Sequence, residues 1–163
     1  REYILIFVCL GTKSFPFNRL LKQIDLLIEN NEIQDEVFAQ IGNSTYEPKN
    51  YKYSRFLTPD EYLEKVKESD IIISHGGTGS LINGLRAGKQ VIGVPRRAKY
   101  GEHSDDHQLQ IVEFFAEQGY IRKIDDMDEL GYVLKDIAKN PITKKFHGKG
   151  RIIEIIDEFI LNS

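Results

Sequence analysis

The sequence predicts an α/β fold, with a Rossmann-like, mostly parallel sheet that helices cover on both faces. Strand-like and helix-like segments alternate along the chain, a pattern typical of repeated βα units joined by right-handed crossovers. The segment 3–10 is continuously apolar, and residues 71–73 are three isoleucines in a row. Such runs lack alternating polar positions, so they indicate strands buried on both faces, as in a parallel sheet.

Turn and cap residues divide the chain into elements. Strands are expected at residues 3–10, 36–41, 70–74, 90–94 and 120–124, with 51–56 as a short edge strand. Helices are expected at 16–30, 58–68, 80–87, 105–118, from 125 or 126 to 139, and at 151–161. Thr58 and Glu61 have the spacing of a capping box around Pro59, while Gly88 and Gly119 are expected to end helices.

Composition narrows the class of protein. The length of 163 residues fits one domain, 1–163, and 40% hydrophobic with 29% charged residues is ordinary for a globular protein. A net charge of −3 argues against a nucleic-acid partner. Cys9 is the only cysteine, so we expect a packed thiol in a reducing compartment. No apolar run approaches the roughly 20 residues that span a bilayer, and no signal peptide is recognised. A cytoplasmic location is expected.

Residues 71–88, IIISHGGTGSLINGLRAG, are predicted to form a buried strand, a glycine-rich turn and a helix. In such a turn the free N–H groups at the start of the helix favour an anion. Gly76, Gly77 and Gly79 allow the backbone to approach phosphate oxygens closely. The turn also carries three side-chain donors: His75, Thr78 and Ser80. It has neither P-loop nor dinucleotide-fingerprint spacing, and a tight turn without a ligand is the alternative.

Two further loops, 11–14 and 96–104, are predicted at the same edge of the sheet, where ligands of parallel sheets bind. Arg96, Arg97 and Lys99 can neutralise a diphosphate or form a solvated surface. Glu102 can act as a base or form a buried ion pair with an arginine.

His103 and His107 stand four residues apart with carboxylates between them, a spacing that can hold a metal. The alternative is a helix start capped by Ser104 or Asp105. We expect no metal site, because a third fixed ligand is missing.

Several motifs together resemble the donor-binding, C-terminal half of GT-B glycosyltransferases, of the family 28 C-terminal-domain type. They are the HGGTGS turn at 75–80, the following helix with Gly88, the strand ending in Val94-Pro95, and Asp106-His107-Gln108. The chain is similar to soluble subunits of two-component enzymes. One is the catalytic subunit of bacterial capsule or exopolysaccharide galactosyltransferases, which residues 6–12, 15–20, 94–96 and 101–103 resemble. The other is the soluble subunit of the eukaryotic N-acetylglucosaminyltransferase that acts on dolichol-linked acceptors.

The resemblance implies roles for single residues. The donor-binding set would be Gly11, Thr12, His75, Gly76, Gly77, Thr78, Gly79, Ser80, Asn83, Arg96, His107 and Gln108. Within it, His75 to Ser80 would bind the diphosphate, and His107 and Gln108 would hold hydroxyls of the sugar. Asn83 stands where relatives usually carry Glu or Asp to hold the ribose, and an amide lacks the strength of a charged acceptor. Glu102 and His103 are the candidate catalytic residues.

The implied function is that of an inverting hexosyltransferase subunit that needs no cofactor. It would transfer a sugar, galactose first and N-acetylglucosamine second, from a UDP-sugar to a lipid-linked saccharide in capsule or exopolysaccharide biosynthesis. A membrane-anchored, acceptor-binding subunit would hold it at the cytoplasmic face of the membrane, and the apolar helix 151–161 is a candidate docking element. Two alternatives are a non-catalytic nucleotide-binding module and a flavodoxin-like or Rossmann-like oxidoreductase. The missing fingerprint in the first loop counts against the oxidoreductase.

Overall fold

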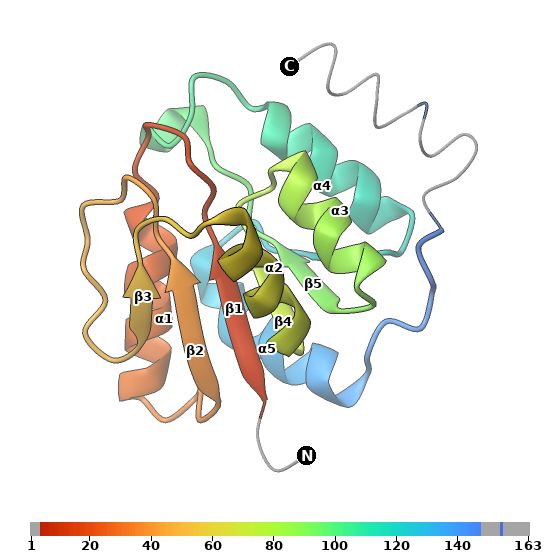
Figure 1. The fold of residues 1–163 in the computed structure, drawn as a ribbon, viewed down its shortest axis with the longest axis horizontal. Coiled ribbons are helices and arrows are strands. Elements are labelled where there is room, and N and C mark those ends of the chain that lie inside the picture. Colours follow the sequence, from red (N-terminus) through yellow and green to blue (C-terminus); the bar gives the residue numbers. More distant parts are fainter. Residues whose placement is uncertain (1–3, 148–153, 155–163) are drawn as a thin grey trace.

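The computed structural model describes residues 4–147 and 154, in which a parallel sheet lies between helical layers (Figure 1). The strands are β1 (Leu5–Cys9), β2 (Glu36–Gln40), β3 (Lys52–Ser54), β4 (Ile71–Ser74), β5 (Gln90–Gly93) and β6 (Arg122–Lys123). The helices are α1 (Asn18–Glu29), α2 (Pro59–Glu68), α3 (Thr78–Arg86), α4 (His107–Glu117) and α5 (Leu130–Lys139), with 3-10 turns η1 (Ala98–Tyr100) and η2 (Met127–Glu129). The predicted Rossmann-like α/β fold is confirmed.

The strands follow the order β3-β2-β1-β4-β5-β6, and every neighbouring pair is parallel. The chain therefore builds outward from β1 to β3, and then returns to place β4 on the other side of β1. This reversal makes the boundary between β1 and β4 the topological switch point, where ligands of open α/β sheets bind. Cys9 is in register with Ser74, so the two strands end level.

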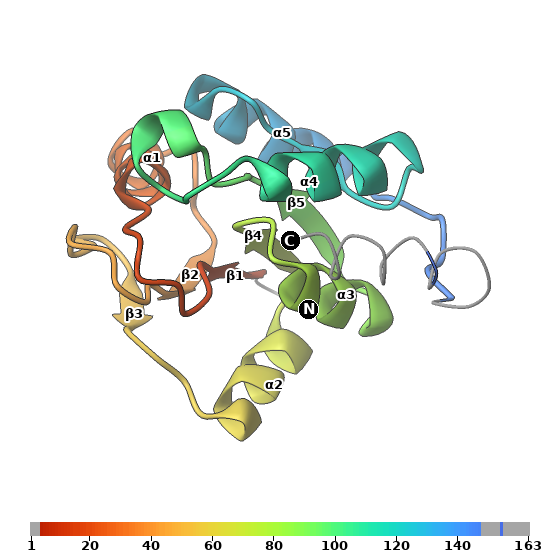
Figure 2. The ribbon, with the colours of Figure 1, turned by 90° about the horizontal axis from the view of Figure 1, so that it is seen from above.

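Helices α1 and α5 cover one face of the sheet, while α2 and α3 cover the other (Figure 2). Alternate residues of β1 divide between the two faces, because side chains along a strand point in opposite directions. Ile6 and Val8 pack in the core under α1 and α5, whereas Phe7 and Cys9 join the core that includes α2, α3 and α4. The continuous apolar run of β1 is thus explained by burial on both faces, as its sequence predicts.

Several element boundaries differ from the predictions. Helix α1 begins at Asn18 rather than at Pro16, because Phe17 has non-helical torsions, with φ −132° and ψ 62°. Helix α4 begins at His107 rather than at residue 105, and the carboxylates of Asp105 and Asp106 instead accept hydrogen bonds from the N–H groups of His107 and Ala98. The last strand is only Arg122–Lys123, and η2 precedes α5.

Other local predictions are confirmed. Glu61 N–H donates to Thr58 Oγ1 at 3.1 Å and Thr58 N–H donates to Glu61 Oε1 at 2.9 Å, which is the predicted capping box. The segment 51–56 contains the edge strand β3, and Cys9 is a buried free thiol. Apart from Glu154, which is helical, the predicted helix 151–161 lies outside the described residues. Among the described residues, no helix is long and apolar enough to cross a membrane.

Candidate functional site

The loops after β1 and β4 meet at the switch point of the sheet. The first contains Gly11, Thr12 and Lys13, and the second is the glycine-rich turn from His75 to Gly77. Helix α3 begins directly after that turn, with Gly77 as its N-cap and no side-chain cap. The first N–H groups of an α-helix have no carbonyl partner within it, so this end of α3 offers free donors and the positive end of the helix dipole.

The imidazole of His75 lies between two glycines. A Cβ atom added to Gly11 would come within 2.7 Å of His75 Nε2, and one added to Gly77 would come within 2.5 Å of His75 Cε1. Gly11 also has a φ of +73°, a left-handed conformation that favours glycine. Both glycines are therefore needed to leave room for the ring, a reason for them that the sequence did not reveal.

A chain of hydrogen bonds fixes the shape of the turn. Gly76 N–H donates to Ser74 Oγ at 3.1 Å, the hydroxyls of Ser74 and Ser80 are 2.6 Å apart, and Ser80 Oγ donates to Gly77 O at 3.0 Å. Since the Ser80 hydroxyl hydrogen goes to Gly77, Ser74 must donate to Ser80. The sequence suggested Ser80 as a donor to phosphate, but its hydroxyl hydrogen is donated within the turn itself.

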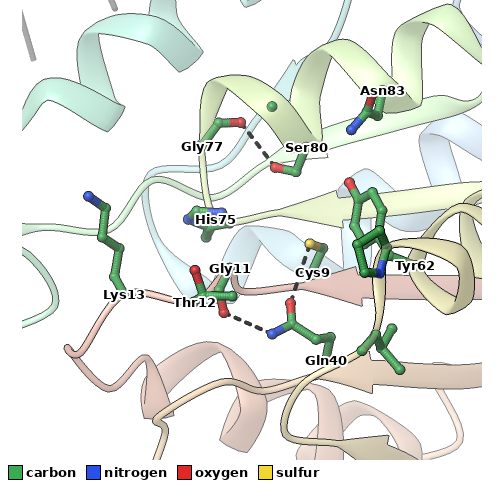
Figure 3. A pocket seen from close by; sticks show the side chains of 13 residues that line it. Cys9, Gly11, Thr12, Lys13, Gln40, Tyr62, His75, Gly77, Ser80 and Asn83 are labelled. Carbon is green, nitrogen blue, oxygen red and sulfur yellow. Dashed lines mark hydrogen bonds between the residues drawn. The ribbon is translucent and has the colours of Figure 1, made fainter.

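Two cavities flank the turn. The α2-side cavity, about 410 Å³, is drawn in Figure 3 and is lined by Cys9, Gly11, Thr12, Lys13, Gln40, Leu57, Pro59, Tyr62, His75, Gly77, Gly79, Ser80 and Asn83. The α4-side cavity, about 260 Å³, is lined by Lys13, His75, Gly76, Gly77, Thr78, His103, Asp105, His107, Gln108 and Ile111. They share three residues: Lys13, His75 and Gly77. The loop after β1 and the glycine-rich turn thus separate two adjoining hollows.

Several buried polar atoms at the site have no partner in the protein. Nδ1 of His75, Nδ1 of His107 and Oε1 of Gln108 are each buried and have no partner with the geometry of a hydrogen bond, although the Gln108 side chain is near enough to His75 to influence its pKa. His75 and Gln108 are each only 6% exposed. Most buried polar groups in proteins are paired, so unpaired atoms that gather beside a cavity indicate a place for a polar ligand.

Burial determines the charge of the site. It lowers the pKa of His75 to about 3, with a further contribution from the nearby positive charge of Arg96. His75 is therefore a neutral imidazole at physiological pH, able to donate from one nitrogen and accept at the other. Burial also raises the pKa of Cys9 to about 11, so this thiol remains protonated and is not a nucleophile.

Gln40, at the end of β2, connects the strand ends beside the α2-side cavity through hydrogen bonds. Its Nε2 group donates to the carbonyls of Gly11 at 2.9 Å and Arg55 at 3.0 Å, and its Oε1 accepts from Cys9 Sγ at 3.6 Å (Figure 3). These bonds join the ends of β1, β2 and β3. They hold Gly11 at the distance from His75 that the packing of the ring requires.

Arg96 was expected to contact the donor, but the structure places its side chain away from both cavities. Its side chain is completely buried and lines neither cavity. Its Nη1 donates to Phe15 O at 2.8 Å and Glu102 O at 3.1 Å, and its Nη2 donates to Leu10 O at 2.6 Å. Burial lowers the pKa of Arg96 to about 10, which still leaves it charged. Arg96 therefore joins the loops after β1 and β5 behind the cavities.

Glu102 forms the ion pair that was one of its two predicted roles. Arg19 Nε and Nη2 donate to its two carboxylate oxygens at 2.7 and 3.0 Å, and Arg97 N–H donates to Oε1 at 3.0 Å. The residue is 3% exposed and lines neither cavity. With both oxygens engaged, Glu102 stabilises the 96–102 loop in this structure.

His103 does line the α4-side cavity. Its ring stacks on Phe15 with centroids 5.8 Å apart, and its Nδ1 lies 3.2 Å from Asp105 Oδ1. His107 and Gln108, at the start of α4, line the same cavity. In the described part of the chain no group of three or more His, Cys, Asp and Glu side chains is placed to hold a metal ion.

Comparison with known proteins places this site in a family. The family model for the glycosyltransferase family 28 C-terminal domain matches residues 5–151, which includes the whole described site. The chain belongs to this family. The sequence resemblance to family 28 is thereby confirmed at the level of the family, while the match does not separate bacterial galactosyltransferase subunits from others.

One curated relative is similar in sequence, and two solved structures share the fold. The UDP-N-acetylglucosamine transferase subunit ALG13 of Candida albicans is 33% identical over 119 residues, 67% of this chain and 37% of the relative. MurG of Acinetobacter baumannii superposes with a TM-score of 0.63 at 15% identity, covering 98% of this chain and 50% of MurG. The solution structure of ALG13 has a TM-score of 0.55 at 20% identity and covers 90% of each chain. The chain spans well under half of the curated Candida relative that it matches.

Much of the α2-side cavity was not predicted from the sequence. Leu57 comes from the segment between β3 and α2, Pro59 and Tyr62 come from the start of α2, and Gln40 comes from the end of β2. None of them belongs to a short motif, although Gln40 stands at the carboxyl end of a strand, which is a usable signal. Lys13 was also missed, and it directly follows Gly11-Thr12.

Proposed function

We propose that this domain binds the UDP-sugar donor of an inverting glycosyltransferase. The observation that carries the proposal is the glycine-rich turn at the switch point, where free helix donors and unpaired side-chain atoms face two adjoining cavities. The membership of family 28 supports it. The names of the ALG13 relatives, transferase subunits for UDP-N-acetylglucosamine, support it further.

The two cavities suggest how a nucleotide sugar is divided. The α2-side cavity has an apolar wall of Leu57, Pro59 and Tyr62 that suits a nucleobase, and Asn83 on its edge can bond the ribose hydroxyls. The diphosphate would then lie across the turn, over the free N–H groups at the start of α3. The sugar would enter the α4-side cavity, where Gln108 Oε1 and His107 Nδ1 lack partners. These atoms would bond its hydroxyls.

In the transfer step, an acceptor hydroxyl attacks the anomeric carbon from the side opposite the diphosphate. The new glycosidic C–O bond forms as the bond from the anomeric carbon to the β-phosphate oxygen breaks, and UDP takes the electron pair. The donors at the start of α3 stabilise the charge that develops on the leaving phosphate. Because Glu102 is tied to Arg19, His103 remains the candidate base of this chain for the acceptor proton. A residue of a partner is the alternative.

The acceptor side of the reaction is proposed to come from a second protein. The ALG13 relatives are named as transferase subunits, and the cavities of this chain lie at one edge of its sheet. We therefore infer a membrane-anchored subunit that presents a lipid-linked saccharide and holds this domain at the cytoplasmic face of the membrane. The sequence resemblance favours galactose and a role in capsule or exopolysaccharide synthesis, while the curated relatives favour N-acetylglucosamine. Both UDP-sugars are to be compared.

The test is transfer of radiolabelled sugar from UDP-galactose and UDP-N-acetylglucosamine to membranes, with and without a co-expressed partner subunit. Calorimetry of the purified chain supplies the binding step. His75→Ala should weaken binding of UDP itself, whereas Gln108→Ala should weaken only binding of the UDP-sugar. Equal losses for both ligands in both variants would refute the division between the cavities. Binding of UDP without transfer, even with the partner, would favour a non-catalytic module.

A further inference from the structure

Lys13 occupies a position that the motifs did not single out. Of the lysines and arginines in the described part of the chain, it alone lines either cavity, and it lines both. Figure 3 shows its side chain rising beside His75, on the side of the turn away from Tyr62. Its positive charge is one of the influences that lower the pKa of His75. The ammonium group therefore lies close to the turn over which a diphosphate would be placed.

The other cations of this edge are engaged elsewhere. Arg96 is buried against main-chain carbonyls, and Arg97 Nε lies 3.5 Å from Asp106 Oδ1. Lys99 Nζ lies 4.9 Å from the centre of the Tyr100 ring. His75 is neutral because burial lowers its pKa to about 3. The side chains at the turn thus carry no permanent positive charge apart from Lys13, within the residues that the structure describes.

The backbone around Lys13 is anchored while its side chain remains exposed. Its carbonyl accepts a hydrogen bond from Asn43 Nδ2 at 2.9 Å, and the carbonyl of Gly11 accepts one from Gln40 Nε2 at 2.9 Å. No ion pair to a carboxylate of the described residues involves Lys13. Because the backbone is fixed and the ammonium group is exposed, the Lys13 side chain can reach an anionic ligand from a defined position.

We propose that Lys13 binds the diphosphate of the donor and stabilises the charge of the departing UDP. This inference rests on the proposed function and deepens it. When the bond between the anomeric carbon and the β-phosphate oxygen breaks, the electron pair stays on that oxygen. The acceptor oxygen takes the sugar, and the acceptor proton passes to the base. The Lys13 ammonium then faces an additional negative charge, so its interaction is stronger in the transition state than in the ground state.

The test uses Lys13→Met and Lys13→Arg, with Lys99→Met as a matched control on the neighbouring loop. Calorimetry of the full chain with UDP and with uridine, at low and high salt, separates a phosphate contact from a change in fold. Lys13→Met should weaken UDP binding about 10-fold, as expected for a hydrogen bond to a charged group at an exposed site. It should leave uridine binding unchanged and reduce the salt dependence. Lys13→Arg and Lys99→Met should retain wild-type affinity within about 2-fold.

Three outcomes overturn the inference. The first is UDP binding by Lys13→Met within about 2-fold of wild type, and the second is an equal loss of UDP and uridine binding. The third is an unchanged salt dependence. A wild-type chain that binds neither UDP nor either UDP-sugar would instead refute the proposed function, and the inference with it. In the transfer assay Lys13→Met should lower kcat at saturating donor, whereas a change confined to KM would remove the transition-state part of the proposal.

Discussion

Replacing Arg96 with Met tests whether one buried guanidinium holds the two loops of the site together. The substitution keeps a long side chain but removes the bonds to the carbonyls of Leu10, Phe15 and Glu102. Each hydrogen bond from a charged donor contributes roughly 1.5–3 kcal/mol, and a buried carbonyl left unpaired adds to the loss. Burying the charged Arg96 side chain also costs desolvation energy, which is reflected in its lowered pKa, and this cost offsets part of the stabilisation from its hydrogen bonds. We expect a net loss of about 2–4 kcal/mol in the free energy of unfolding.

The assay is urea unfolding followed by circular dichroism, paired with UDP titration at a temperature where the variant is folded. Arg86→Met is the matched control, because Arg86 is an exposed residue in the last turn of α3, and it should change stability by less than about 0.5 kcal/mol. Arg96→Met should also bind UDP more weakly, since Leu10 directly precedes Gly11. A variant with wild-type stability and wild-type UDP affinity would show that Arg96 does not hold the two loops of the site together.

Two further predictions concern the turn. Gly77→Ala should displace His75, because the added Cβ would lie 2.5 Å from Cε1, and should cost about 1–3 kcal/mol of stability together with UDP affinity. Gly79→Ala is its control: no atom lies within 4 Å of the added Cβ, so the helix should be stabilised by up to about 1 kcal/mol. The second prediction concerns pH: the pKa of His75 is about 3 in the folded chain, against the ordinary histidine value of 6.5 expected after unfolding. Between these two values the unfolded chain binds a proton at His75 that the folded chain does not bind. The free energy of unfolding therefore falls as pH falls from 6.5 toward 3. His75→Gln should flatten this slope by roughly 1 kcal/mol per pH unit; urea unfolding at several pH values would contradict the prediction if the slopes of variant and wild type coincide.

Features that depend on neighbouring residues were predictable from the sequence. The capping box of Thr58 and Glu61 needs only a three-residue spacing, and the burial of β1 needs only its unbroken apolar run. The glycine-rich turn was found because β4, the turn and α3 are consecutive, and the order of elements brought the loop after β1 to the same edge.

Features that depend on distant residues were not predictable in the same way. Arg96 bonds Leu10 across 86 positions, and Arg19 pairs with Glu102 across 83. Arginine and glutamate residues that face a ligand can have the same sequence pattern as those that form ion pairs within the protein. Only the packed structure therefore distinguishes a residue that anchors a loop from one that binds a ligand. The role of Gly11 in leaving space for His75 depends likewise on the close pairing of β1 with β4.

Binding of a nucleotide diphosphate at the carboxyl ends of β1 and β4 can be tested by mapping amide chemical shifts. The measurement is a titration of the isotope-labelled chain with UDP, followed by two-dimensional NMR. We expect the largest shifts on residues 11–13 and 75–80, and we expect the signals of residues 107 and 108 to move only when a UDP-sugar replaces UDP. Shifts concentrated at the opposite edge of the sheet, or none at saturating UDP, would contradict this prediction.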